Sequence, residues 1–129
     1  MGTYNKQNLR AVEDAAPKFD MPTEMHARFA RGALDGETLG LTLFKLEPNF
    51  RIPFGHKHEE QEEVYVVVRG SGRVKVDDEV VELQQWDAIR FGKSAMRDME
   101  AGPDGIEYLA FSAGKDPRDA EMVQGWWSD

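Results

Sequence analysis

Two histidines and a glutamate stand close together near the middle of the chain, at a spacing that suits metal binding. His56 and His58 are two positions apart, and Glu63 follows five positions later. Alternate side chains of a β-strand share one face, so both imidazoles would point in the same direction. Imidazole nitrogens and carboxylate oxygens suit divalent Fe, Mn, Zn, Ni and Co, so the ligand types do not identify the metal. If a neighbouring strand brings Glu63 beside the histidines, the three side chains can hold one divalent metal ion.

The spacing of these residues resembles the first signature motif of the cupin superfamily. That motif has the form His-x-His, four residues, Glu, six residues and Gly, and its positions here are His56, His58, Glu63 and Gly70. One departure is Phe50, which stands where the family pattern has a glycine. The resemblance implies that the two histidines and the glutamate bind a divalent metal inside a small β-barrel. It also implies that the glycine closes the following hairpin.

A second cupin motif is only partly preserved. In the family this motif supplies a histidine as the fourth metal ligand, after a Gly-Asp pair, a strand and a turn. Asp87 and the strand match, whereas Trp86 replaces the glycine and Arg97 stands in place of the histidine. Because arginine stays protonated and has no free lone pair, Arg97 cannot bind a metal. The chain thus resembles a small single-domain cupin with an intact first motif and a degraded second motif.

The arginine leaves two hypotheses for the pocket. In the first, His56, His58 and Glu63 hold the metal, and Arg97 binds the carboxylate or phosphate of a substrate. In the second, Arg97 replaces the charge of the metal and pairs with Glu63, which leaves a metal-free polar pocket. The first hypothesis explains three intact ligands, whereas the second avoids placing a metal cation beside a guanidinium.

Three further side chains are candidates for the same pocket. Tyr65 lies two residues after Glu63 in the predicted strand, so it shares that face and is the candidate catalytic proton donor. A structural role in the barrel core fits Tyr65 equally well. His26 is either a structural residue or a fourth ligand, and Glu62 would replace Glu63 if the preceding loop were one residue shorter. In a simpler alternative, both histidines lie exposed on an edge strand and bind nothing.

The rest of the sequence predicts an all-β domain around these residues. Strand patterns cover residues 25–29, 39–44, 50–58, 63–69, 73–76, 80–83, 89–91 and 106–111, with turns at 70–72, 77–79 and 102–105. Many short strands separated by Gly and Pro turns indicate a barrel or a sandwich. The cupin resemblance favours the double-stranded β-helix, which is a jelly-roll barrel.

We expect a single domain with three parts. Residues 1–38 form an extended N-terminal arm with the first strand or strands, residues 39–112 the barrel core, and residues 113–129 a C-terminal tail. Trp126 and Trp127 of the tail are expected to pack on the barrel or on a partner subunit. The strand at 63–69 is apolar on both faces, so its outer face needs a cover, which a second sheet, the N-terminal arm or a partner subunit could provide. We expect a homodimer.

Composition restricts the class of partner. The net charge of -8 disfavours nucleic acid, because the phosphate backbone would be repelled. The absence of cysteine excludes disulfides and zinc sites built on thiolates. No apolar run is long enough to span a bilayer, and the first ten residues lack the apolar centre of a signal peptide. We therefore expect a cytoplasmic protein that does not bind membranes.

These features together predict a small-molecule protein. We expect one divalent metal ion, an anionic small molecule such as an organic acid or a phosphorylated sugar, and a metal-dependent dioxygenase or isomerase. The alternative is a non-catalytic binding or sensor module that uses the same pocket with or without metal. The fold by itself does not choose between the two.

Overall fold

Most of the chain forms β-strands, as the alternation of apolar and polar residues predicts. The computed structural model describes residues 3–114 and 119–129. Its elements in chain order are the short 3-10 helices η1 (Leu9–Ala11) and η2 (Ala16–Phe19) and the strands β1 (Met25–Phe29), β2 (Leu39–Leu46), β3 (Phe54–His58), β4 (Glu62–Val76), β5 (Glu79–Leu83), β6 (Ala88–Phe91), β7 (Arg97–Ala113) and β8 (Ala120–Gln124). Neither helix within these ranges has the length or the apolar character needed to cross a membrane.

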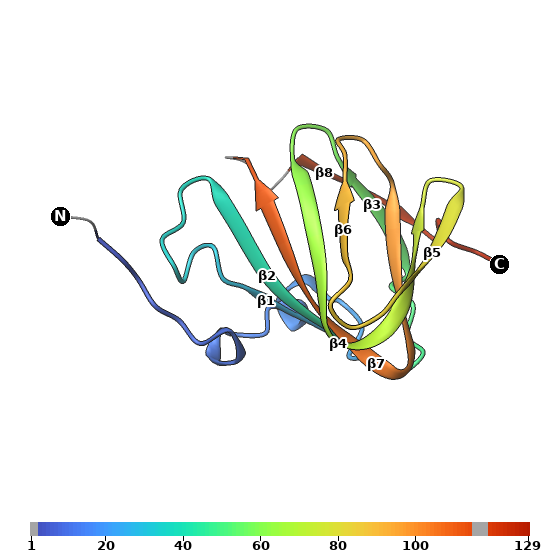
Figure 1. Ribbon diagram of the computed structural model, residues 1–129, viewed down its shortest axis with the longest axis horizontal. Helices are drawn as coiled ribbons and strands as arrows, with labels where there is room; N and C mark the ends of the chain where they lie inside the picture. Colours follow the sequence, from blue (N-terminus) through green and yellow to red (C-terminus); the bar gives the residue numbers. More distant parts are fainter. Residues whose placement is uncertain (1–2, 115–118) are drawn as a thin grey trace.

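The strands form one curled antiparallel sheet. Neighbouring strands follow the order β1-β2-β7-β3-β8, while β4 pairs with β5, β6 and β7. Figure 1 shows how β2, β7 and β4 curve around the interior while the N-terminal segment runs outward from the barrel. The prediction of an all-β jelly-roll barrel is confirmed.

Two predicted turns are wrong, because both lie inside long strands. The chain does not reverse at Gly70 or at Gly105. Both glycines have positive φ, and a Cβ at Gly70 would lie 2.1 Å from the carbonyl oxygen of Gly105. The pairing of β4 with β7 shifts register between Val67 and Arg69 and again between Gly70 and Gly72. These β-bulges bend both strands around the barrel, so Gly70 does not close a hairpin.

The later part of the N-terminal arm and the C-terminal tail pack on the barrel. The expected N-terminal arm contains η1 and η2, and it buries Val12 and Ala16. The tail forms β8, a strand that the sequence patterns did not indicate and that pairs along the whole of β3. After β8, Trp127 is buried beneath Arg51, whose guanidinium lies 4.0 Å from the centre of an indole ring. The prediction that this tryptophan packs on the barrel is therefore confirmed.

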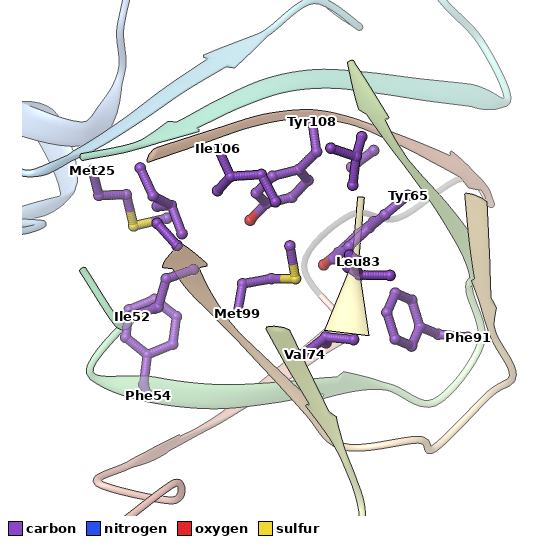
Figure 2. Packing of buried hydrophobic residues seen from close by; sticks show 14 residues of the cluster. Met25, Ile52, Phe54, Tyr65, Val74, Leu83, Phe91, Met99, Ile106 and Tyr108 are labelled. Atoms are coloured by element: carbon purple, nitrogen blue, oxygen red, sulfur yellow. The ribbon is translucent and has the colours of Figure 1, made fainter. Parts of the chain in front are cut away.

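The interior is filled from several strands. Figure 2 shows Met25, Ile52 and Phe54 on one side of the interior and Tyr65 and Phe91 on the other. Tyr65 contacts Phe91 and Tyr108, with ring centres 4.7 and 5.0 Å apart respectively. This aromatic group lies beside the strand ends that carry the predicted ligands.

Candidate metal centre

Two strands bring the predicted ligands together, and a third places Arg97 beside them. His56 and His58 lie two positions apart on β3. After the loop at residues 59–61, Glu63 is the first buried residue of β4. The register of β3 and β7 places Arg97 opposite His56. His58, Glu63 and Arg97 are all buried, so the alternative of histidines exposed on an edge strand is wrong.

One carboxylate oxygen is the meeting point of the site. Oε1 of Glu63 lies 3.6 Å from Nε2 of His56 and 3.3 Å from Nε2 of His58. Two ligands that each lie about 2.1 Å from an ion, at angles between octahedral and tetrahedral, are roughly 3.0 to 3.4 Å apart. The separation of the His58 and Glu63 atoms falls in that range, and the separation from His56 lies slightly above it. The donor set therefore fits a single divalent ion.

The orientation of His58 is fixed by a residue far away in the sequence. Nδ1 of His58 lies 2.6 Å from a carboxylate oxygen of Asp119. The backbone amide of Glu60 donates to the second oxygen at 2.9 Å, and the side chain of Gln61 donates to the first oxygen at 2.9 Å. Carboxylates that hold the second nitrogen of a metal-binding histidine orient the ring and raise its basicity. Sequence reasoning missed Asp119, because no spacing rule connects it to the motif.

This contact has a consequence for the proton on His58. A carboxylate at its ordinary ionisation only accepts hydrogen bonds, so Nδ1 of His58 must donate to Asp119. In the neutral ring, Nε2 then turns its lone pair toward the Glu63 carboxylate at 3.3 Å. Two acceptors at that distance repel each other unless a proton or a cation lies between them. A metal ion satisfies both, and in its absence a proton on Nε2 does so, because the hydrogen bonds with Glu63 and Asp119 raise the pKa of His58.

The electrostatics of the site keep Glu63 ionised and act in opposite directions on the two histidines. Burial would raise the pKa of Glu63, but hydrogen bonds with His56 and His58 and the charge of Arg97 hold that pKa well below its usual range. Burial lowers the pKa of His56, and the charge of Arg97 adds to this effect. Burial would lower the pKa of His58 as well, yet hydrogen bonds with Glu63 and Asp119 raise it. An ionised carboxylate thus faces at least one neutral imidazole.

Arg97 lies inside the site rather than at its edge. Only 1% of this residue is exposed. One terminal nitrogen donates to the same Glu63 oxygen that the histidines approach, and the other donates to the carbonyl of Ala95 at 2.9 Å. The guanidinium also stacks 4.8 Å from the ring of Phe91. The pairing with Glu63 is the contact that the second hypothesis requires, although a carboxylate has enough lone pairs to accept from Arg97 and bind a metal together.

Of the three further candidates, Tyr65 lies at the cavity, whereas His26 and Glu62 lie outside the metal-binding group. Tyr65 is buried at the wall of the cavity, and burial together with the nearby Glu63 charge raises its pKa strongly. His26 lies outside the site, where its ring contacts Asp14 at 2.8 Å and Glu47 at 3.2 Å. It is therefore not a fourth ligand. Glu62 pairs with Arg90 at 2.8 Å, with both side chains exposed, so it does not replace Glu63.

The metal-binding group opens into a cavity of about 540 Å³. Its walls come from η2, β1, β2, β3, β4, β7 and β8, and most of the lining side chains are apolar. His56, His58, Glu63 and Arg97 all line this space. The arrangement can therefore hold a small molecule against a metal ion.

Comparison with known proteins agrees with this description. The family model described as "Cupin domain" matches residues 42–101. A cupin protein from Bacteroides fragilis is 20% identical with a TM-score of 0.72, and the match covers 100% of this chain and 99% of that one. No curated protein matches the chain in sequence.

Two further solved structures share the fold. A sugar phosphate isomerase of the cupin superfamily from Silicibacter pomeroyi is 15% identical with a TM-score of 0.71, with 93% of this chain and 92% of that chain covered. Oxalate decarboxylase from Bacillus subtilis is 17% identical with a TM-score of 0.72, with 95% of this chain but 33% of that chain covered. At these identities the likeness concerns the fold alone. Residues 42–101 therefore match the cupin family model, and the described residues have the fold of the cupin structures.

Proposed function

We propose that this protein is a metal-dependent enzyme, an oxygenase or an isomerase, that acts on an anionic small molecule. One divalent ion would be held by His56, His58 and Glu63. The observation that supports this most directly is the convergence of one donor atom from each of His56, His58 and Glu63, all within 4.8 Å of one another. A divalent ion among these atoms would be bound by all three side chains at once.

The chain's own residues have separate tasks in this proposal. A bound ion would supply Lewis-acid or dioxygen chemistry. Arg97 lines the cavity, and its charge orients an anionic ligand toward the ion. Tyr65 stays protonated because burial raises its pKa, so its hydroxyl is available as a donor to the ligand. That one similar fold is described as an oxalate decarboxylase and another as a sugar phosphate isomerase supports an anionic substrate.

Metal content tests the proposal. The protein, purified without a histidine tag, should contain or take up one divalent ion per chain, as measured by elemental analysis. His58→Ala should abolish this binding, since it removes one of three ligands. His26→Ala is the matched control, because His26 is a histidine outside the site and its loss should leave the metal content unchanged. A chain that takes up no metal, or equal loss in the two variants, would contradict the proposal.

A metal-free binding module is the second candidate. The contact between Arg97 and Glu63 supports it, because the guanidinium already neutralises the only carboxylate of the predicted ligand set. In this case ligand affinity should be the same before and after treatment with a chelator. If the enzyme proposal holds, chelation should instead weaken ligand binding.

A further inference from the structure

We infer that the ligand of this cavity is an amphipathic acid, with an anionic head and an aromatic or branched apolar body. This inference rests on the proposed function, which places the charged head of the ligand at the metal centre. It goes further by choosing among the anionic small molecules that the site would accept.

The cavity has one polar region and one large apolar wall. The polar groups gather near Tyr65 and Phe91, where the guanidinium of Arg97 stacks on the Phe91 ring. Met25 lies across the interior from these two rings (Figure 2). Met25 and Phe29 of β1 and Phe44 of β2 form much of the wall beyond the metal centre. A ligand that fills the space must therefore be polar at one end and apolar along its body.

Exposed apolar side chains at the same cavity also indicate that the wall binds an apolar surface. Phe19 of η2, Phe29 of β1 and Met122 of β8 all line the cavity, and all three are among the large apolar residues that remain exposed. Phe29 links the group to the interior, with ring centres 6.1 Å from Phe19 and 6.4 Å from Phe44. Apolar side chains that converge on a cavity favour the binding of an apolar surface.

The charges around the metal centre select the head of the ligand. Asp119 and Glu63 contribute two negative charges, while Arg97 and a divalent ion contribute three positive ones. With a metal bound and both histidines neutral, the positive charges of these four groups exceed the negative ones. An anionic head such as a carboxylate is therefore attracted to this end of the cavity, and Arg31 and Asp98 are further charged side chains of the lining.

The wall also disfavours a polyhydroxylated ligand. Every hydroxyl that leaves water needs a hydrogen-bond partner in the protein. Met25, Phe29 and Phe44 offer none, and the hydrogen-bonding side chains of the lining, such as Thr42 and Ser112, form the smaller part of it. Sugar phosphates, which the sequence left open as substrates, therefore match less of this wall than an apolar body does.

Calorimetry with four probes tests the inference. We would titrate the full chain, loaded with Co²⁺ and separately stripped with EDTA, with 3-phenylpropionate, 3-phenylpropanol, malate and ribose 5-phosphate. The loaded protein should bind 3-phenylpropionate at least about tenfold more tightly than each of the other three, because only this probe has both parts of the ligand. Tighter binding of malate or ribose 5-phosphate, or no binding of any probe in either state, would overturn the inference.

Two phenylalanines of almost equal exposure provide a matched pair of variants. Phe29 is 41% exposed and lines the cavity, whereas Phe111 is 42% exposed and does not line it. Phe29→Ala should weaken the binding of 3-phenylpropionate about tenfold, and Phe111→Ala should leave it unchanged. Circular dichroism checks that both variants fold. If Phe29→Ala does not fold, Met122→Gln serves as a second variant of the cavity wall. Equal affinities in wild type and the wall variant would place the apolar body elsewhere.

The same titrations separate this inference from the proposed function. If Co²⁺ does not bind but 3-phenylpropionate still binds in a manner that depends on Phe29, the metal proposal fails and the ligand class stands. If Co²⁺ binds stoichiometrically and 3-phenylpropionate binds no better than malate, the ligand class fails and the metal proposal stands.

Discussion

The carboxylate of Asp119 lies 2.6 Å from Nδ1 of His58, although the two residues are 61 positions apart in the sequence. The contact exists because β8 pairs with β3 along its whole length and brings the start of the tail beside the loop before β4. The same carboxylate accepts the backbone amides of Glu60 and Gln61, at 2.9 and 3.3 Å. Asp119 therefore orients His58 and also holds the loop that leads to Glu63.

Asp119→Asn should weaken metal binding by roughly 10-fold to 100-fold, the usual effect of removing a carboxylate that orients a metal-binding histidine. The measurement is a competition titration against a chelator. Asp129→Asn is the control, because Asp129 lies in the same tail but pairs with Arg51 at 2.8 Å, away from the ligands. Unchanged affinity in Asp119→Asn would show that His58 keeps its orientation without this partner.

Arg97→His should raise metal affinity by supplying the fourth ligand that the second cupin motif lacks. Position 97 is suitable because its side chain already reaches the Glu63 carboxylate. Arg90→His, at an exposed arginine of β6, is the control and should have no effect. The same metal titration measures both variants, and equal affinities would mean that an imidazole at position 97 does not reach the ion.

Asp98 makes stability depend on pH. Burial raises the pKa of this carboxyl to about 7, and the charge of Arg51 offsets only part of that effect, while Lys75 and Glu100 are the other charged groups that act on it. In the unfolded chain the same group ionises near about 4. The folded state therefore resists an ionisation that the unfolded state undergoes, so stability is lost as pH rises from about 4 to about 7.

Asp98→Asn should remove this dependence and raise the free energy of unfolding at about pH 8 by about 1 to 3 kcal/mol. Denaturation at about pH 5 and about pH 8 measures the change. Asp78→Asn, in the exposed turn between β4 and β5, is the control. A variant that is no more stable than wild type at the higher pH would show that Asp98 ionises freely in the folded protein.

The homodimer expected from the sequence stays a prediction. Leu41, Phe111 and Val64 lie opposite one another on β2, β7 and β4, in a row that the register places on one face of the sheet. Phe111 remains well exposed there. If a second copy covers this face, light scattering should give twice the mass of the chain, and Val64→Glu should reduce it to that of a monomer. A monomeric wild type would overturn the expectation.

The three predicted ligands could be located from sequence because strand periodicity alone decides which way they point. His56 and His58 share a face in any β-strand, and Glu63 needed only a short loop to return beside them. The strand at residues 97–101 was missed, since it pairs with residues 72–76 of β4 only after both strands have bent. Glycine tolerates positive φ in turns and in bulges alike, so Gly70 and Gly105 could not distinguish the two from sequence.

The partners of the ligands were harder to predict. Arg97 was expected in the pocket, but whether its guanidinium would face a substrate or Glu63 depends on distances that spacing does not give. Met122 belongs to β8 and Asp119 immediately precedes it, and the place of this strand is decided by pairing with β3. Their contribution to the site follows from the tertiary structure alone.

The last strand has a practical consequence for anyone who alters the end of this protein. β8 supplies Met122 to the apolar wall, and the residue just before it anchors His58. A chain that ends before residue 119 would retain His56, His58 and Glu63. It would nevertheless lose both the carboxylate that orients His58 and the Met122 side chain of the apolar wall. Affinity labels and immobilisation chemistry therefore belong at the opposite terminus, which runs outward from the barrel (Figure 1).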